Sequence, residues 1–213
     1  MLLIIATELH LQCNFYPNYF NIMILSKKVF PFLILIFSSL ILFSSCKKDD
    51  PEIANEEEII TTLTYTLTTN DTTGKKTVVL SFKDLDGDGG NRPIITGGTL
   101  AANTIYEGKI EVLNEIAGKN ITQEIKAESA EHQFFFSPTD VKLSFFYADI
   151  DDTEAKNPVG LETMVTTNQP STGKLKITLR HEPNKNAEGV KDGNIANAGG
   201  ETDIEVEFDV TIE

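Results

Sequence analysis

Three kinds of residue are scarce in this chain, and each scarcity excludes something. The 213 residues include two cysteines and no tryptophan, and 18 lysines and arginines stand against 32 aspartates and glutamates. The formal charge of −14 repels nucleic acid phosphates, which argues against nucleic acid as a partner. Cys13 and Cys46 both precede most of the chain. The residues after Cys46 therefore cannot be stabilised by a disulfide within them and must bury a hydrophobic core instead.

One long apolar run is present, and it lies close to the amino terminus. Lys27 and Lys28 precede the apolar segment 29–43, and two serines then lead to Cys46. This order of basic, apolar and small residues predicts a secretory signal peptide. A run of about 15 residues is also shorter than the roughly 20 that cross a bilayer as a helix, so a permanent membrane span is the weaker interpretation.

The chain divides into four parts. Met23 begins a complete signal peptide, 23–45, so we interpret residues 1–22 as an extension upstream of the true start. Residues 46–58 are charged and poor in apolar side chains, which predicts a flexible tether behind Cys46. Residues 59–213 form one domain of ordinary size. From Cys46 onward there are 16 basic and 31 acidic residues, a formal charge of about −15 that favours divalent cations over anions.

Apolar residues alternate with polar ones over much of this domain. Such a period of two predicts half-buried strands of an antiparallel sheet. Gly, Asn, Asp and Pro clusters separate the strands, and only residues 121–130 offer a short helical alternative. Eight to ten short strands predict an all-β fold, an immunoglobulin-like or jelly-roll-like β-sandwich, with a small barrel as the alternative. The alternation is found in residues 62–68, 77–83, 141–145, 174–180 and 204–213.

The domain also contains a faint internal duplication. Leu80-Ser81-Phe82 matches Leu143-Ser144-Phe145, and with two inserted residues Asp84 and Asp86 match Asp149 and Asp151. We interpret this as two similar multi-strand halves packed together. Chance similarity is the alternative, because strands and turns use few residue types.

The acidic turns are candidate cation sites. DLDGDGGN, residues 84–91, places three carboxylates at alternate positions on a glycine-bent loop, and such hard oxygen ligands suit Ca²⁺. It is not an EF-hand, since Ile95 stands where the closing glutamate would be and Pro93 blocks a following helix. Two such loops at one end of the domain could share an ion or hold one each, and the alternative is that aspartates cap their own turns. The predicted calcium ligands are Asp84, Asp86, Asp88, Asn91, Asp149, Asp151 and Asp152.

Catalytic residues are harder to find. His132 and His181 each have a glutamate neighbour, but no spacing typical of a zinc site is present, so ordinary loop histidines are the favoured interpretation. There is no nucleophile elbow or free thiol, and the protein is predicted not to be an enzyme. The missing tryptophan argues mildly against a sugar-stacking platform, for which Tyr65, Tyr106 and Tyr147 could substitute.

The residues FSSCKKDD around Cys46 resemble the lipobox and tether of lipoproteins from the Bacteroidetes group, with Phe43 where leucine is usual. The resemblance implies a lipid on the Cys46 thiol, and the charged residues 47–50 look like the signal for cell-surface display. The periplasmic face of the outer membrane is the alternative. Further along, EEEIITTLTYTL, SFKDLDGDGGN, RHEPNK and GGETDIEVEFDV resemble a family of small, acidic flavobacterial lipoproteins that has no established activity. Some members carry a periplasmic-binding-fold label, whose helices this sequence lacks.

Together these features predict an outer-membrane-anchored, non-enzymatic binding or adhesion module. Its partners are the membrane, through the lipid, and an unidentified extracellular or outer-membrane ligand, and Ca²⁺ could stabilise it. An accessory subunit of an outer-membrane complex is the first alternative. A glycan hydrolase that uses acidic residues is the second.

Overall fold

The computed structural model describes residues 59–69, 74–87 and 89–213. Cys46, the tether and the signal peptide lie outside these residues, as does Asp88. The described residues belong to the second of two units, which runs from Asn55 to Glu213. Its strands are β1 (Thr62–Thr69), β2 (Thr77–Lys83), β3 (Ile94–Thr96), β4 (Gly98–Leu100), β5 (Ile105–Leu113), β6 (His132–Thr139), β7 (Leu143–Tyr147), β8 (Glu162–Thr167), β9 (Ser171–His181) and β10 (Glu201–Ile212).

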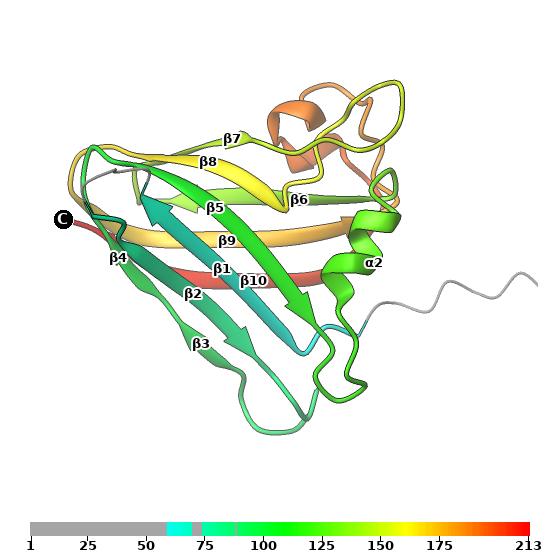
Figure 1. The fold of residues 1–213 in the computed structure, drawn as a ribbon, viewed down its shortest axis with the longest axis horizontal. Helices are drawn as coiled ribbons and strands as arrows, with labels where there is room; N and C mark the ends of the chain where they lie inside the picture. Colours follow the sequence, from blue (N-terminus) through cyan, green and yellow to red (C-terminus); the bar gives the residue numbers. More distant parts are fainter. Residues whose placement is uncertain (1–58, 70–73, 88) are drawn as a thin grey trace, which may run out of the picture. The chain divides into compact units, whose positions relative to one another are not determined.

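Two sheets face each other in this unit (Figure 1). One has six strands in the order β3-β2-β1-β5-β8-β7, and the other has four in the order β4-β10-β9-β6. All the pairings between these strands are antiparallel except that of β4 with β10. The two sheets keep separate edges and do not close into one, so the predicted all-β sandwich is confirmed and the closed alternative is not.

The alternation in the sequence explains how the core forms. In β10 the apolar residues are buried and the acidic residues between them are exposed. Since successive side chains of a strand point to opposite faces, one face of β10 packs against the other sheet and one meets water. The side chains that β10 contributes to the core are Ile204, Val206, Phe208, Val210 and Ile212.

β6 departs from this pattern because both of its faces are covered. Phe134 and Phe136 belong to the main core, whereas Phe135 packs with Val190 and other apolar residues of the segment 183–200 in a second, smaller cluster. That segment contains the short 3-10 turns η2 (Val190–Asp192) and η3 (Ile195–Asn197). The long loop after β9 is therefore a cover for the outer face of β6.

The predicted duplication does not extend to the strand arrangement. The match of Leu80-Ser81-Phe82 with Leu143-Ser144-Phe145 pairs β2 with β7, and its continuation, in which Ile110 and Val112 match Leu175 and Ile177, pairs β5 with β9. β2 and β5 lie in the same sheet, but β7 lies in the six-stranded sheet and β9 in the four-stranded one. The two halves therefore do not fold alike.

The predicted helical segment forms α2 (Ile121–Ala127). The Asn120 side chain accepts a hydrogen bond from the backbone N–H of Gln123, which caps the first turn. Ile121 and Ile125 are buried in the core, so α2 packs beside the end of β5 (Figure 1). Among the described residues, no helix has the length and apolar character needed to cross a bilayer.

Candidate functional site

The first acidic turn is held by its own carboxylates. Asp84 Oδ1 accepts the backbone N–H of Gly87 at 2.9 Å, and Asp86 Oδ2 accepts both the backbone N–H and the side-chain amide of Asn91 at 2.8 and 2.7 Å. The backbone and side-chain hydrogen bonds from Asn91 lower the pKa of Asp86. Two predicted ligands, Asp86 and Asn91, thus contact each other, and the described carboxylates of this loop accept hydrogen bonds from the loop itself.

The aspartates of the second loop also have partners within the protein. Asp149 accepts the backbone N–H groups of Gly160 and Leu161, each at 2.8 Å. Burial raises the pKa of Asp149, and these hydrogen bonds oppose the rise. Asp152 Oδ1 accepts the hydroxyl of Ser129 at 3.3 Å.

Asp151 is paired with a buried lysine. Its Oδ2 lies 3.6 Å from Lys185 Nζ, and the two side chains are 1% and 3% exposed. Burial raises the pKa of Asp151, but the hydrogen bond from Thr153 and the charge of Lys185 outweigh burial and lower it. Lys185 also donates to the carbonyls of Ser129 and Pro158 at 2.5 and 3.1 Å. The cation that balances Asp151 in the structure is therefore a side chain of the same chain.

The two acidic loops do not come together. They follow β2 and β7, which have three strands between them in the six-stranded sheet. Four strand spacings amount to about 19 Å, and Figure 1 shows the loops at separate corners of the sheet. A single ion shared by both loops is incompatible with this separation. A Ca²⁺ ion in either loop alone stays a prediction.

The two histidines, by contrast, lie next to each other. His132 begins β6 and His181 ends β9, and the antiparallel register pairs them directly. Residues paired in this way point to the same face of a sheet, and here the face is the inner one, at the end of the sandwich beside α2 (Figure 1). Their rings stack with centroids 4.6 Å apart.

Asp203 joins this histidine pair. The register between β9 and β10 shifts between Thr202 and Ile204, so Asp203 is the extra residue of a β-bulge, and bulges redirect side chains. Its carboxylate is 1% exposed, with Oδ2 3.9 Å from His132 Nε2 and Oδ1 3.9 Å from His181 Nδ1. Two imidazoles and one carboxylate thus converge in a place that water hardly reaches.

The tautomer of His132 follows from its second nitrogen. Nδ1 lies 3.2 Å from the carbonyl oxygen of Glu128. Because a carbonyl can only accept, Nδ1 carries the proton, and Nε2 turns its lone pair toward Asp203. Burial lowers the pKa of His132, and the neighbouring His181 lowers it further against the opposing effect of the Glu128 carbonyl. The neutral ring is therefore favoured.

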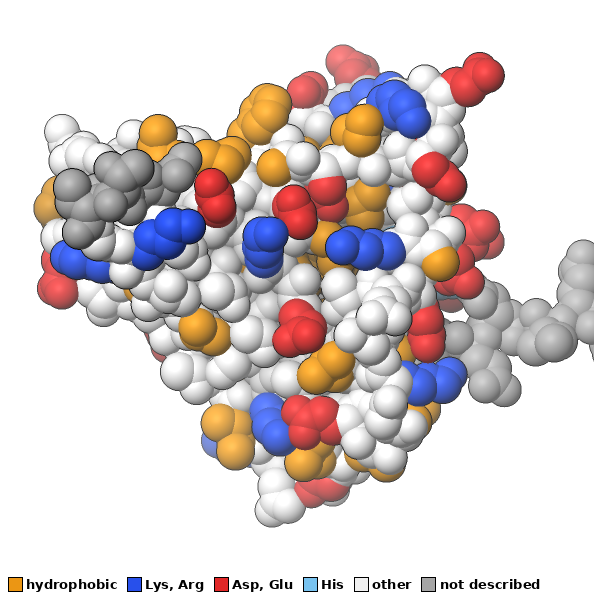
Figure 2. Space-filling model, in the orientation of Figure 1, with side chains coloured by type: hydrophobic (Ala, Val, Ile, Leu, Met, Phe, Trp, Pro, Cys, Tyr) orange, Lys and Arg blue, Asp and Glu red, His pale blue; other side chains and the backbone are white. Residues whose placement is uncertain are grey.

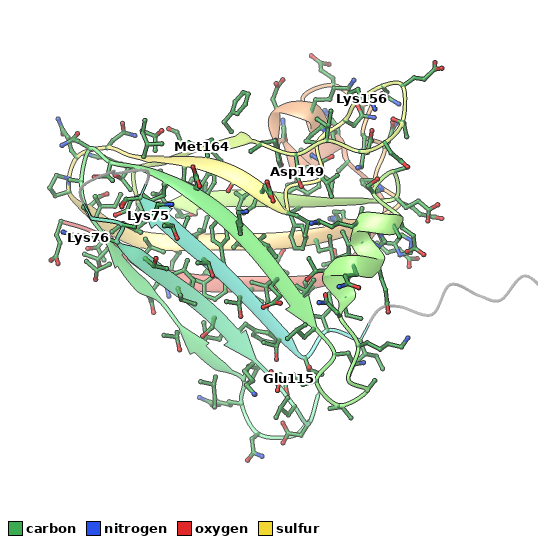
Figure 3. All side chains as sticks on the ribbon, viewed as in Figure 1. Lys75, Lys76, Glu115, Asp149, Lys156 and Met164 are labelled. Atoms are coloured by element: carbon green, nitrogen blue, oxygen red, sulfur yellow. The ribbon has the colours of Figure 1, made fainter. Side chains whose placement is uncertain are left out.

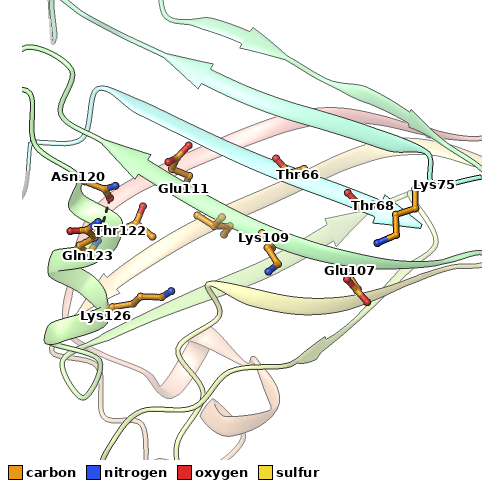
Figure 4. Close-up of a pocket in the computed structure, with 11 residues that line it drawn as sticks. Thr66, Thr68, Lys75, Glu107, Lys109, Glu111, Asn120, Thr122, Gln123 and Lys126 are labelled. Atoms are coloured by element: carbon orange, nitrogen blue, oxygen red, sulfur yellow. Dashed lines mark hydrogen bonds between the residues drawn. The ribbon is translucent and has the colours of Figure 1, made fainter. Parts of the chain in front are cut away.

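A polar groove lies on the outer face of the six-stranded sheet. The groove, of about 600 Å³, lies over β1 and β5 and ends at α2 (Figure 4). Thr66 and Thr68 of β1 point into it beside charged side chains of β5. Figure 2 shows charges of both signs interspersed over this face. The polar side chains that line the groove are Thr66, Thr68, Lys75, Glu107, Lys109, Glu111, Asn120, Thr122, Gln123 and Lys126.

An exposed aromatic ring lies on the same face. Glu107 pairs with Met164 of β8, and Met164 pairs with Phe146 of β7. Directly paired residues share a face, so Phe146 is two strand spacings, about 10 Å, from the groove at Glu107. Phe146 is 73% exposed. Met164 is labelled between these strands in Figure 3.

The three tyrosines that could stack on sugars are less exposed than Phe146. Tyr65 and Tyr106 are almost fully buried in the core, and the Tyr65 hydroxyl is hydrogen-bonded to Thr163 at 2.6 Å. Tyr147 donates to the carbonyl of Phe134 at 2.7 Å, and burial raises its pKa to about 12. The suggestion from the sequence that these rings could stack on sugars is therefore wrong for Tyr65 and Tyr106, whereas Tyr147 is half-buried and lines a surface pocket beside Phe146.

Comparisons of the chain with family models, curated proteins and solved structures find no match.

Two parts of these sites were not evident from the sequence. In the sequence, Asp203 resembles the other acidic residues on the solvent-exposed face of β10. Only the bulge, which is not visible in the sequence, turns its side chain inward. Phe146 lies in a run of aromatic residues that indicates a core strand, and only the sheet order shows that β7 is an edge. A signal for the histidine pair did exist, because each histidine adjoins a terminus of a strand-like segment.

Proposed function

We propose that the protein is a non-enzymatic binding module, anchored on the outer membrane by a lipid on Cys46, and that it binds neutral polysaccharide on the outer face of the six-stranded sheet. The observation that carries the proposal is the polar groove over β1 and β5 with Phe146 exposed in register beside it. A groove continued by an aromatic ring suits an extended, hydroxylated chain.

The chemistry of the lining supports a neutral ligand. Threonine hydroxyls and the amides of Asn120 and Gln123 can both donate and accept hydrogen bonds. Three lysines and two glutamates leave the lining with a net charge of one positive unit, while the whole chain carries −14. A polyanion would be repelled by the whole protein more than this single local charge attracts it. Sugar hydroxyls carry no such penalty.

The spacing of the carboxylates in the groove supports binding over hydrolysis. Glu107 and Glu111 are on the same face of β5, four residues apart. Their Cα atoms are therefore about 14 Å apart. Glycoside hydrolases generally place their two carboxyl groups about 5 to 9.5 Å apart. Side chains of a strand stand roughly perpendicular to the sheet, so the two carboxyl groups are expected to stay near the separation of their Cα atoms, which supports binding over hydrolysis.

The anchoring part of the proposal is supported by the sequence around Cys46. Mass spectrometry of the amino-terminal peptide of native protein tests it. The expected peptide begins at Cys46 and carries the mass of a diacylglycerol with or without a further acyl chain. A native peptide that begins upstream of Cys46 and carries no lipid would contradict the anchor.

Affinity electrophoresis tests the binding part. The protein is the chain from residue 46 with Cys46→Ser, and the native gels contain dextran, laminarin or mannan. We expect at least one of these neutral polysaccharides to retard the protein. Phe146→Ser removes the exposed ring and is expected to weaken binding roughly 2- to 10-fold. Gln123→Ala removes one hydrogen-bonding group and is expected to weaken it about 5-fold.

A matched control is Ile94→Ser, an equally exposed apolar residue on β3. It lies away from the groove and is expected to leave the retardation unchanged. Equal mobility in all gels would contradict polysaccharide binding. Retardation that is insensitive to Phe146→Ser and Gln123→Ala, or that Ile94→Ser also abolishes, would contradict the location of the site.

A further inference from the structure

The buried end of the four-stranded sheet holds a polar cluster that the proposed function does not use. His132, His181 and Asp203 come from three neighbouring strands, β6, β9 and β10. Their ligand atoms all lie within 4.8 Å of one another. Burying polar groups costs free energy unless they form hydrogen bonds or ion pairs. These three buried side chains therefore need interactions that offset the cost of their burial.

The contacts around His132 show which of its ring nitrogens could bind an ion. The distance of 3.9 Å between His132 Nε2 and Asp203 Oδ2 is too long for a hydrogen bond. His132 is fully buried, and no hydrogen-bond partner reaches Nε2 among the residues that the structure describes. Its Nδ1 proton is held by the Glu128 carbonyl, which is how a protein commonly orients a metal-binding histidine. The lone pair of Nε2 points to where an ion would lie.

We propose that His132, His181 and Asp203 form a binding site for a transition metal ion of the Zn²⁺ class. Two imidazoles and one carboxylate are a donor set that suits zinc, whereas Ca²⁺ and Mg²⁺ take oxygen ligands almost alone. With zinc–ligand bonds of about 2.0 to 2.2 Å, tetrahedral ligand atoms lie roughly 3.3 Å apart. Each histidine nitrogen lies 3.9 Å from the Asp203 carboxylate, and all three ligand atoms lie within 4.8 Å of one another. Binding of an ion would draw these atoms closer and turn the two rings from their stacked arrangement.

The surroundings provide an entrance and a fourth ligand position. His181 also lines a surface pocket with Glu182, Gly200 and Glu201. The carboxylates of Glu131 and Glu182 come within 4.8 Å of the same ring. An ion can therefore enter from the His181 side and complete its coordination with water. Such an ion would join β6, β9 and β10 at the end of the sandwich, independently of the groove.

Thermal unfolding with defined metals tests the site. The chain from residue 46 with Cys46→Ser is stripped with a chelator and then measured with ZnCl₂, CaCl₂ or MgCl₂. At about a hundredfold excess over Kd, zinc is expected to raise Tm by roughly 5 to 10 °C. Dialysed protein is expected to retain one zinc per chain, and Co²⁺ in its place should show the visible absorption of tetrahedral coordination. Calcium and magnesium are expected to have no effect through this site.

Asp203→Asn is the diagnostic variant because it keeps the shape of the side chain. Zinc affinity is expected to fall roughly 100-fold or more, since loss of outer contacts alone costs 10- to 100-fold. If Asp203→Asn fails to fold, His181→Asn takes its place, and it should lose the zinc-dependent rise in Tm in the same way. The control, Glu131→Gln with Glu182→Gln, is expected to retain most of the zinc-dependent rise in Tm.

Three results would overturn the proposal. Zinc could leave Tm unchanged in the unsubstituted chain. Zinc could raise Tm equally in the Asp203→Asn or His181→Asn variant. The glutamate double variant alone could abolish binding, which would place the ion at the surface instead of the buried cluster.

Discussion

Lys185 holds three segments of the protein together, and replacing it tests that role. The substitution Lys185→Met keeps an unbranched apolar stem of similar length but removes the charge. It leaves the Asp151 carboxylate without its ion-pair partner at 3.6 Å and frees the carbonyls of Ser129 and Pro158. Because Lys185 is only 4% exposed, water cannot easily replace these contacts. Removing one partner of a buried pair costs about 3 to 5 kcal/mol.

Urea unfolding followed by circular dichroism measures this free energy. The protein is the chain from residue 46 with Cys46→Ser, with and without Lys185→Met. The double variant Lys185→Met, Asp151→Asn removes both charges and is expected to lose less than the sum of the single losses, by about 0.5 to 3 kcal/mol. If Lys185→Met costs less than about 1 kcal/mol, as exposed ion pairs do, the assignment of Lys185 as a buried anchor is incorrect.

Three other expectations concern stability. The pKa of Asp151 is lowered in the fold, so its contribution to the free energy of unfolding should be complete above about pH 4 and be lost as the pH falls further. The free energies of unfolding of Asp151→Asn and the unsubstituted chain, measured by urea titration, should therefore converge in acid. A difference that stays constant with pH would argue against the shift. Tyr65→Phe removes the buried hydrogen bond to Thr163 and should lower the free energy of unfolding by about 1 to 2 kcal/mol. Burial raises the pKa of Tyr65, so an ultraviolet pH titration of the variant should lack one tyrosine that ionises at unusually high pH. Phe135→Ala should cost about 3 to 5 kcal/mol and speed protease cleavage within 183–200; unchanged cleavage would show that the segment does not depend on this contact.

The strands with one solvent-exposed face could be predicted from the sequence. β1, β2, β9 and β10 alternate over much of their length, because one face meets the core and the other meets water. β6 was not predictable in this way. Its run from His132 to Phe136 is buried without interruption, since the segment 183–200 covers its outer face, and a strand covered on both sides loses its period of two.

The candidate sites were less predictable than the fold. Carboxylates on a turn indicate a cation site, but the pattern does not show which cation balances them, and for Asp151 it is Lys185, 34 residues further along. The cluster around His132 depends on the register of β6 with β9 and on a bulge at Asp203. Register and bulges arise from pairing between distant segments, so no local pattern reports them.

The most direct test of the central claim maps the ligand onto the protein. Amide chemical shifts of the ¹⁵N-labelled chain from residue 46, with Cys46→Ser, are followed while the polysaccharide that retards it most in the gels is added. We expect changes at Thr66, Lys109, Gln123 and Phe146, which together trace the groove and its aromatic neighbour. Spectra that stay unchanged, or changes confined to the acidic turns and the inner core, would contradict the claim.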